Sequence, residues 1–377
     1  MDSKETLRRP AKCVVKIDDR EITEFYPYLQ QLSVEVSRRD AAVCSMTFVS
    51  VRDEGGMWNI QDADMFSPWR RIKVEAVFGS HSEEIMRGYI RDVKADYPED
   101  MNSTVTVTCQ DESIKLDREH VKKKYSTEEQ PLNDDALIKE LLKPEWVGAK
   151  VKAAAGTTCG NLNFDGTPIR LIRYRAALNG YEFYIREGVA HFEPPDLAGD
   201  PQPAILIYAG PASNCLNFSV HHDGHRPDSV SFVDAPESDG DVNGGESYSG
   251  NSQLLGKKAA DSKALGLNKF DLHIRMPRGS TPAEREAYAK AEAEDAAWKI
   301  RAVGMLDGSM YGHVLLTNRT VTVDGVGGTY GGVWYVDEVK HSFSADGYSQ
   351  AFRLIRNATG EMGLTGKTDT LAQVRQR

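Results

Sequence analysis

The sequence predicts a mainly β protein in which two antiparallel barrels or sandwiches flank a small α+β unit. Alternating strand patterns fill both ends of the chain, and helix signals fill its middle. In addition, each β-rich part contains the pattern aromatic, β-branched, any, acid, Val, Lys, any, any, aromatic. It occurs as YIRDVKADY at residues 89–97 and as YVDEVKHSF at residues 335–343. In both places a turn and a second strand follow, which favours an internal duplication.

The first unit is expected over residues 10–115. In LSVEVS the side chains of Leu32, Val34 and Val36 share one face of a strand, and CSMTFVSV and IKVEAVF alternate in the same way. Turn formers such as DEGG separate these stretches. Repeated half-buried strands with turns between them indicate an antiparallel barrel or sandwich.

An α+β insertion is expected over residues 116–205. The stretch LNDDALIKELLKP has Asn133 as a plausible N-cap. The stretch TPIRLIRYRAALNG begins with Thr167 and Pro168 as cap and first helical residue, and it ends at Gly180. A hairpin, YEFYI followed by VAHFEP, comes next, so the order is helix, helix, hairpin.

Strands return over residues 206–357, interrupted by an expected long loop at residues 235–256 and a helix at residues 281–303. Thr281 and Glu284 form a capping box that begins this helix. The last residues, 358–377, are predicted to be a tail that is either without a fixed structure or a docking strand.

The helix at residues 281–303 has two narrow stripes of alanine on nearly opposite faces, with Ala287 and Ala291 in one of them. A helix that packs on one core needs only one apolar stripe, so two suggest contact with a second surface, such as a neighbouring subunit. The alternative is that alanine serves only as a strong helix former. The candidate interface residues are Ala289, Ala293, Ala296, Ile300, Trp298 and Trp334.

Composition excludes several classes of protein. The 377 residues are 40% hydrophobic and 27% charged, which is ordinary for a globular protein, and apolar runs long enough to span a membrane are absent. The beginning of the chain lacks the apolar core of a signal peptide, so synthesis in the cytoplasm is expected. A net charge of −10 argues against binding to nucleic acid. The five scattered cysteines are expected to be reduced structural thiols.

The order of elements resembles the late control D family, the baseplate hub proteins of contractile phage tails. The resemblance rests on MRGYIRDVKADYPEDMNSTVTVTCQDESIKLDRE, on HHDGHRPDSVSFVD, on AEREAYAKAEAEDAAWK and on GGVWYVDEVKHSFSADGYSQAFRLIRN. It covers most of residues 10–357, and it extends to the related N-terminal part of type VI secretion spike proteins. The fold it implies is two tandem tail-tube-like antiparallel β-barrels with an inserted helix-helix-hairpin domain.

The same resemblance implies a structural role without enzymatic activity, cofactor or metal. Three chains would present six similar barrels, so that a homotrimer joins the sixfold tail tube to a threefold spike. The residues after Asn357 are too few to form a spike, so a separate spike protein is expected. Other implied partners are the tail tube or a tube-initiator protein, the baseplate wedge proteins and the tape measure protein, and neither nucleic-acid binding nor membrane insertion is expected. The implied location is the virion tail baseplate, with assembly in the host cytoplasm.

Three other features of the sequence suggest alternatives to this role. A zinc site from Cys215, His221, His222, Asp223 and His225 is disfavoured, because adjacent residues of a strand point to opposite sides.

The acid pairs Asp134/Asp135 and Glu292/Glu294 could serve a glycosidase, but they occupy helix positions where acids are common. The third alternative is a carbohydrate-binding or cell-wall-degrading tail component. Its candidate aromatic residues are Trp58, Trp69, Trp146 and Trp334.

Overall fold

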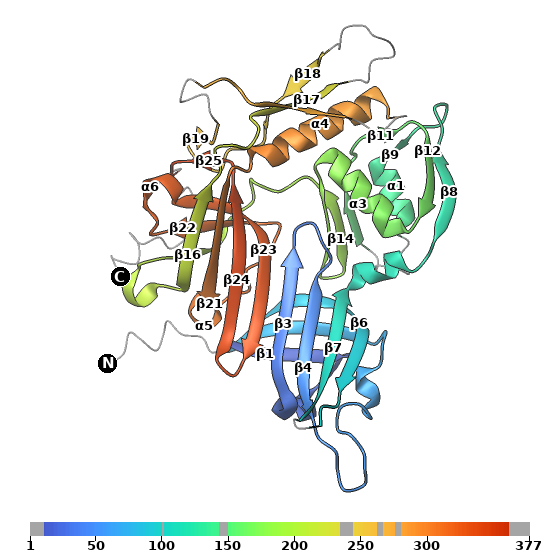
Figure 1. The fold of residues 1–377 in the computed structure, drawn as a ribbon, viewed down its shortest axis with the longest axis vertical. Helices are drawn as coiled ribbons and strands as arrows, with labels where there is room; N and C mark the ends of the chain where they lie inside the picture. The colour runs from blue at the N-terminus through green and yellow to red at the C-terminus, as the bar shows by residue number, and fades with distance from the viewer. Residues whose placement is uncertain are drawn as a thin grey trace.

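The computed structural model describes residues 11–99, 102–142, 150–233, 244–261, 267–275 and 280–361. Strands from both ends of the chain form one large sheet that curls into two barrels, and a third unit packs beside them (Figure 1). The predicted fold class, two tandem antiparallel barrels with an inserted α+β unit, is therefore confirmed. Across the ranges given above, no helix is long and apolar enough to cross a membrane.

The first barrel has the strand order β3-β4-β7-β6-β5-β1-β2. The strands are β1 (Ala11–Ile17), β2 (Arg20–Glu21), β3 (Leu29–Ser37), β4 (Val43–Ser50), β5 (Arg71–Phe78), β6 (His81–Asp96) and β7 (Ser103–Asp111). Short 3-10 helices η1 (Thr23–Tyr28), η2 (Asp64–Phe66) and η3 (Glu112–Asp117) connect or follow them.

The second barrel has the order β16-β21-β24-β23, with β22 beside β23 and β15 beside β22. These strands are β15 (Gln202–Leu206), β16 (Cys215–His222), β21 (Ile300–Asp307), β22 (Thr320–Asp324), β23 (Gly332–Ser344) and β24 (Gly347–Arg356). Short helices η4 (Gly210–Ala212), α5 (Gly308–Tyr311) and α6 (Gly327–Tyr330) lie in the connections.

The described residues of the inserted unit form two helices and several short strands around an apolar cluster of their own. Its elements are β8 (Val121–Ser126), β9 (Leu132–Asn133), α1 (Asp134–Leu141), β10 (Lys150–Ala153), β11 (Thr158–Cys159), β12 (Leu162–Gly166), α3 (Pro168–Asn179), β13 (Glu182–Arg186) and β14 (Val189–Glu193). Helix α3 begins and ends as its sequence predicts, with Thr167 as N-cap, Pro168 in the first turn and Gly180 in the left-handed conformation at φ 66°.

A small layer covers the top of the second barrel and the inserted unit (Figure 1). It consists of α4 (Pro282–Ala297) and the strands β17 (Ser229–Val233), β18 (Gly244–Tyr248) and β20 (Asp271–Ile274), while β19 (Lys258–Ala259) pairs with β25 (Ala358–Thr359). The expected loop at residues 235–256 is thus wrong for residues 244–248, because β18 pairs with β17 there. The expected tail is wrong for its first residues, because Ala358 is buried. Residues 235–243 and 362–377 lie outside the described residues.

Helix α4 ends earlier than its sequence predicts. The capping box at Thr281 and Glu284 is present, but the helix stops at Ala297 instead of residue 303. Trp298 leaves the helical conformation, and its ring stacks on Tyr335 with the centroids 6.0 Å apart. Ile300 then begins β21 opposite Arg356 of β24. Tertiary packing of Trp298 and Ile300 therefore overrides the helical propensity of this stretch.

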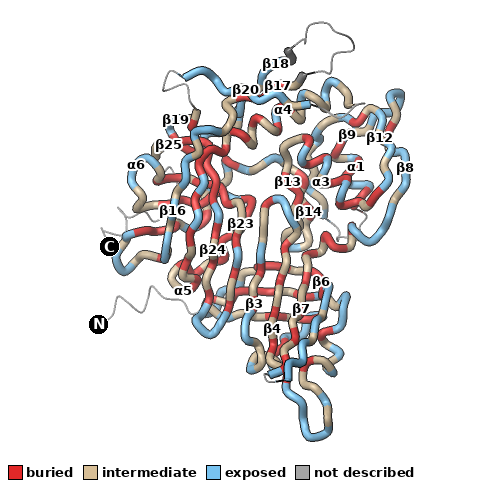
Figure 2. Tube along the Cα trace, viewed as in Figure 1, coloured by how far each residue is buried: buried red, intermediate tan, exposed pale blue. Residues whose placement is uncertain are grey.

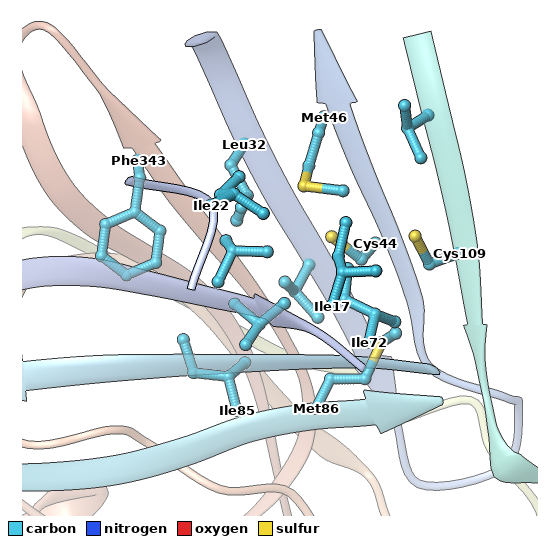
Figure 3. Packing of buried hydrophobic residues seen from close by; sticks show 14 of the residues in the cluster. Ile17, Ile22, Leu32, Cys44, Met46, Ile72, Ile85, Met86, Cys109 and Phe343 are labelled. Atoms are coloured by element: carbon cyan, nitrogen blue, oxygen red, sulfur yellow. The ribbon is translucent and has the colours of Figure 1, made fainter. Parts of the chain in front are cut away.

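The first barrel encloses an apolar cluster formed by the inward residues of its strands (Figures 2 and 3). Leu32, Met46 and Ile72 are buried in it, in agreement with their alternation in the sequence. Cys44 and Cys109 face each other across β4 and β7 as free thiols. Phe343 comes from the second barrel into the same cluster, so the two barrels share part of one core.

Candidate assembly surface

The two copies of the nine-residue pattern occupy equivalent strands. Tyr89 begins the first copy in β6 and pairs with Arg71 of β5, and Tyr335 begins the second copy in β23 and pairs with Thr320 of β22. On the other side, β6 pairs with β7 and β23 pairs with β24, both antiparallel. The prediction that both copies occur in the same strand of a repeated hairpin is confirmed by these pairings.

Irregularities of the sheet also recur at equivalent positions. The ladder between β6 and β7 shifts register at Arg91, and the ladder between β23 and β24 shifts at Asp337, the third residue of the pattern in both copies. A second pair of bulges falls at Gln30 between β3 and β4 and at Leu216 between β16 and β21. Because bulges are specific local features of a strand, their coincidence favours duplication.

A residue with positive φ precedes β5 and β22 at the same place. Trp69 has φ 72° and donates its backbone N–H to the Ile90 carbonyl at 2.7 Å, and Asn318 has φ 57° and donates to the Val336 carbonyl at 3.2 Å. The next residue is an arginine in both copies. The Arg70 carbonyl accepts a hydrogen bond from the Ile90 N–H at 3.0 Å, and the Arg319 carbonyl accepts one from the Val336 N–H at 3.0 Å. Residues other than glycine rarely adopt this conformation, so its recurrence is a strong sign of common origin.

Within the chain the two barrels are joined edge to edge by β3 and β23 (Figure 1). The antiparallel pairing runs from Glu338 opposite Ser37 to Phe343 opposite Leu32. The ammonium group of Lys340 donates to Glu35 across this junction at 2.6 Å. The sheet therefore continues from one barrel into the next without an exposed edge at this point.

The equivalents of the two strand segments that form this junction lie elsewhere in the chain, and each has one edge without a partner strand in the described residues. β16 is the equivalent of β3, and in the described chain its ladder partner is β21 alone. The second half of β6, residues 92–96, is the equivalent of the part of β23 that pairs with β3, and within the described ranges it pairs with β7 alone. Unpaired strand edges are templates for pairing with another chain. We define β16 and residues 92–97 as the two assembly edges.

Apolar residues lie exposed at both assembly edges. Tyr97 is 59% exposed beside the first edge and Leu216 is 62% exposed on the second. In the junction within the chain, the equivalent of Tyr97 is Phe343, which lies opposite Leu32 and is buried in the core of the first barrel. Tyr97 is therefore exposed where its equivalent is covered, whereas the equivalent of Leu216 is Gln30, which is itself exposed.

A buried polar network ties the two barrels to the inserted unit. Glu182 of β13 accepts hydrogen bonds from Tyr335 Oη at 2.7 Å and Asn318 Nδ2 at 2.9 Å, and Arg38 lies 3.4 Å from its other carboxylate oxygen. Arg38 also donates to Asp337 at 2.8 Å. Burial raises the pKa of Glu182, and Arg38 and the two hydrogen bonds oppose that rise. The network therefore links residues of both barrels directly to the inserted unit.

Replacing Tyr335 with phenylalanine should lower the free energy of unfolding by about 1.5–3 kcal/mol, because the ring stays but one donor to a buried carboxylate is lost. Urea unfolding of the wild type and of Tyr335→Phe measures this loss. Tyr208→Phe is the control, because Tyr208 is 89% exposed and its change should have little effect. Equal midpoints for all three proteins would contradict the role of the hydroxyl.

The interface candidates of α4 are covered within one chain. Ala289, Ala293 and Ala296 are buried, and α4 contacts α3 on one side and β17 on another. The helix therefore packs between two surfaces, as its two alanine stripes suggest, but both surfaces, α3 and β17, belong to the same chain. Trp298 and Trp334 are buried in apolar clusters, and Ile300 belongs to β21. A subunit contact at these residues stays a prediction.

The alternative sites have different surroundings from those their sequence suggests. Asp134 is fully buried and bonded to Arg175, and Glu294 accepts the backbone N–H groups of Asn251 and Ser252, so these acids already have structural partners. Trp146 lies outside the described residues.

The other aromatic candidates also pack within the protein. The ring of Trp58 contacts that of Tyr97, and the guanidinium of Arg118 lies 4.2 Å from the centre of the Trp69 ring. Trp334 is fully buried.

Among the described residues, His81, Glu83 and His313 are the group whose ligand atoms come close enough to hold a metal ion. The histidines of β16 that the sequence suggested are not part of it. His81 and Glu83 alternate in one strand, which is a visible signal, but the third member is 230 residues away. Sequence reasoning missed the group because only the fold brings His313 there.

Ser231, Asp271 and His273 on β17 and β20 look like a catalytic triad but lack its order. The Ser231 hydroxyl lies 2.8 Å from His273 Nδ1 and 2.7 Å from Asp271 Oδ2, while the histidine and the aspartate are 4.0 Å apart. In a triad the histidine stands between the other two. This cluster is therefore a hydrogen-bonded feature of the small sheet.

Solved structures similar to this chain include proteins of phage tails and of a type VI secretion system. The 43 kDa tail protein of prophage MuSo2 from Shewanella oneidensis has 13% identity, covers 93% of this chain and 99% of its own, and has a TM-score of 0.67. A tail protein from Neisseria meningitidis MC58 has 12% identity, coverage of 92% and 97%, and a TM-score of 0.62. The E. coli c3393 protein, a component of the type VI secretion system, has 10% identity, coverage of 93% and 80%, and a TM-score of 0.56.

With identities this low, the likeness is one of fold, and it defines a class: mainly β proteins built like phage tail proteins. The chain belongs to the family described as Alg8 N-terminal domain, whose model matches residues 9–345. That name differs from the late control D family that the sequence resembles. No curated protein matches the sequence.

Proposed function

We propose that the protein is a structural baseplate hub of a contractile phage tail or a related injection system, without enzymatic activity. In this proposal it belongs to the late control D type and acts as a trimeric adaptor between a sixfold tail tube and a threefold spike. The fold shared with tail proteins and with a type VI secretion component supports a tail role. The observation that carries the proposal is the recurrence of the β3 and β23 junction as two unpaired assembly edges.

The register of the internal junction predicts the contact between chains. Lys340 lies opposite Glu35, and the equivalents of these residues are Lys94 on β6 and His221 on β16. Lys94 of one chain should then face His221 of the next. Each chain contributes one edge of each kind, so the contact is head to tail and generates a ring when the rotation closes. Two barrels per chain and sixfold pseudosymmetry set the number of chains at three.

The partners follow from this geometry. One face of the ring would receive the tail tube or a tube-initiator protein, and the other would seat a separate spike protein. Baseplate wedge proteins would contact the periphery, and the tape measure protein would reach the channel. The net charge of −10 suits a channel through which nucleic acid passes without adhering. The location would be the virion baseplate after assembly in the host cytoplasm.

The double variant Lys94→Cys with His221→Cys should form disulfides between chains under mild oxidation. Directly opposite residues of antiparallel strands have Cα atoms about 4.5–5.5 Å apart, within the range that a disulfide spans. Nonreducing gels should show covalent dimers and trimers, and light scattering of the wild type should give three copies of the 41.8 kDa chain, alone or with its spike. Both positions are exposed, so the fold should tolerate the change.

Three controls make the result specific. Either single variant should stay monomeric on the gel, and the wild type treated alike accounts for its own free cysteines. Lys94→Cys with Ser219→Cys places the thiols two residues out of register, beyond the reach of a disulfide. A stable monomer at high concentration and in the presence of the spike, with no disulfide in the matched pair, would overturn the proposal.

A further inference from the structure

The group formed by His81, Glu83 and His313 joins β6 of the first barrel to the segment that follows α5 in the second barrel. His81 Nε2 lies 2.7 Å and His313 Nδ1 lies 2.8 Å from the same oxygen, Glu83 Oε1. The two histidine rings meet edge to face with their centroids 5.9 Å apart. Three potential ligands from two barrels therefore converge on one point.

The first barrel positions two of these ligands through a tight hairpin. The turn between β5 and β6 contains Gly79 at φ 66°, and His81 pairs with Phe78 directly after it. His81 and Glu83 are two residues apart in a strand, so their side chains leave the same face. The ring of Phe78 lies 6.1 Å from that of Tyr348, which fixes this hairpin against the second barrel.

The second barrel holds His313 in place through the end of α5 and through Gln350. Gly312 ends α5 in the left-handed conformation at φ 69° and directs the chain toward the hairpin. Fully buried Gln350 donates to the His313 carbonyl at 2.8 Å and accepts from the Leu315 N–H at 2.7 Å. The Val314 N–H donates to Glu83 Oε2 at 2.5 Å, so the carboxylate is oriented and its Oε1 is left for the two imidazoles.

We propose that His81, Glu83 and His313 bind one divalent transition-metal ion of the zinc type. Two imidazole nitrogens and one carboxylate oxygen are a ligand set that zinc and its neighbours in the first transition series accept. Ligand atoms around a tetrahedral zinc ion are about 3.3 Å apart, given bonds of about 2.0 Å. The two histidine nitrogens lie 2.7 and 2.8 Å from Glu83 Oε1, about half an ångström closer than this, and all three ligand atoms lie within 4.8 Å of one another, so side-chain rotations would have to open the site to admit the ion.

The site is open enough for exchange and leaves room for water as a further ligand. The side chain of His81 is 52% exposed, that of His313 35% and that of Glu83 24%. Because the ligands come from both barrels, a bound ion links the β5 and β6 hairpin to the loop after α5. In the metal-free protein, hydrogen bonds among the three side chains connect the two barrels. A bound ion would make this connection more rigid.

Isothermal titration of the full chain, free of any affinity tag and treated with chelator, tests this site with ZnCl2 as the probe. One equivalent should bind to the wild type. His81→Ala and His313→Ala should each weaken binding by more than about tenfold, a loss seen even for outer partners of metal ligands. Glu83→Gln should weaken it as well, and its amide keeps an acceptor for the Val314 N–H.

His120→Ala is the matched control, because His120 also contacts a single carboxylate, Asp165, but within the described residues it belongs to no group of three potential metal ligands. Its zinc affinity should equal that of the wild type. Cobalt gives a second readout through its visible absorption, which zinc should remove. Melting curves without metal verify that every variant is folded. Equal zinc binding by the wild type, His81→Ala and His313→Ala would overturn the proposal and leave the group as hydrogen bonds only.

Discussion

Replacing Arg175 with alanine should lower the free energy of unfolding by about 3–5 kcal/mol, because the change leaves a buried carboxylate without its cation. Arg175 Nε donates to Asp134 Oδ1 at 2.6 Å and Nη2 donates to Oδ2 at 3.2 Å. Its Nη1 donates to Glu284 of α4 at 2.5 Å. Arg175 and Asp134 are both fully buried, so water cannot replace the lost partner.

Urea unfolding followed by circular dichroism measures this loss, with Arg170→Ala as the control. Arg170 lies in the same helix and is exposed, so its replacement should cost less than about 1 kcal/mol. The double variant Arg175→Met with Asp134→Leu should be less harmful than Arg175→Ala, since it removes both charges together. If Arg175→Ala and Arg170→Ala had equal midpoints, the ion pair would not hold α3 to α4 and α1.

Local chemistry made much of the fold predictable. The first and last residues of α3, the capping box of α4 and the alternation in β3 and β4 are all signals carried by a few neighbouring residues, and each occurs in the structure as expected, although the Thr167 side chain makes no capping hydrogen bond. The repeated nine-residue pattern predicted equivalent strands, because Val93 and Val339 face the cores at the same place in each hairpin. Patterns of this kind depend on backbone geometry that every strand and helix shares.

Contacts between distant residues could not be predicted in this way. The third residue of the pattern is Arg91 in one copy and Asp337 in the other, so nothing in its chemistry announces a shared bulge. The pairing of β3 with β23 joins parts of the chain about 300 residues apart. Asp134 lies in the first turn of α1, where an acid is common. Its burial and its ion pair with Arg175 become visible only when α3 is packed against it.

Acid should destabilise the protein through His341, which lies in β23 opposite Val34 of the barrel junction. The side chain is 1% exposed, and burial lowers its pKa from 6.5 to about 3. Its Nδ1 lies 2.8 Å from the hydroxyl of Tyr348, so the neutral ring has a partner. A depressed pKa in the folded state contributes stability above pH 6.5, and this contribution is lost as the pH falls, because only the unfolded chain takes up the proton.

Each pH unit in this window changes the free energy by about 1.4 kcal/mol, so the His341 contribution should fall by about 2–3 kcal/mol between pH 6.5 and pH 4.5. Carboxylates also titrate near the lower limit, so the measurement is a difference between proteins.

Urea unfolding at pH 7, 6.5, 5.5 and 4.5 should show a steeper loss for the wild type than for His341→Gln, whose amide stays neutral and still reaches the Tyr348 hydroxyl. His225→Gln should retain the slope of the wild type, because His225 is exposed and lies outside β3 and β23, the two strands of the junction. If the free energy of unfolding fell equally with pH for the wild type and His341→Gln, His341 would take up its proton in the folded barrel as well. The loss of stability in acid would then come from other groups.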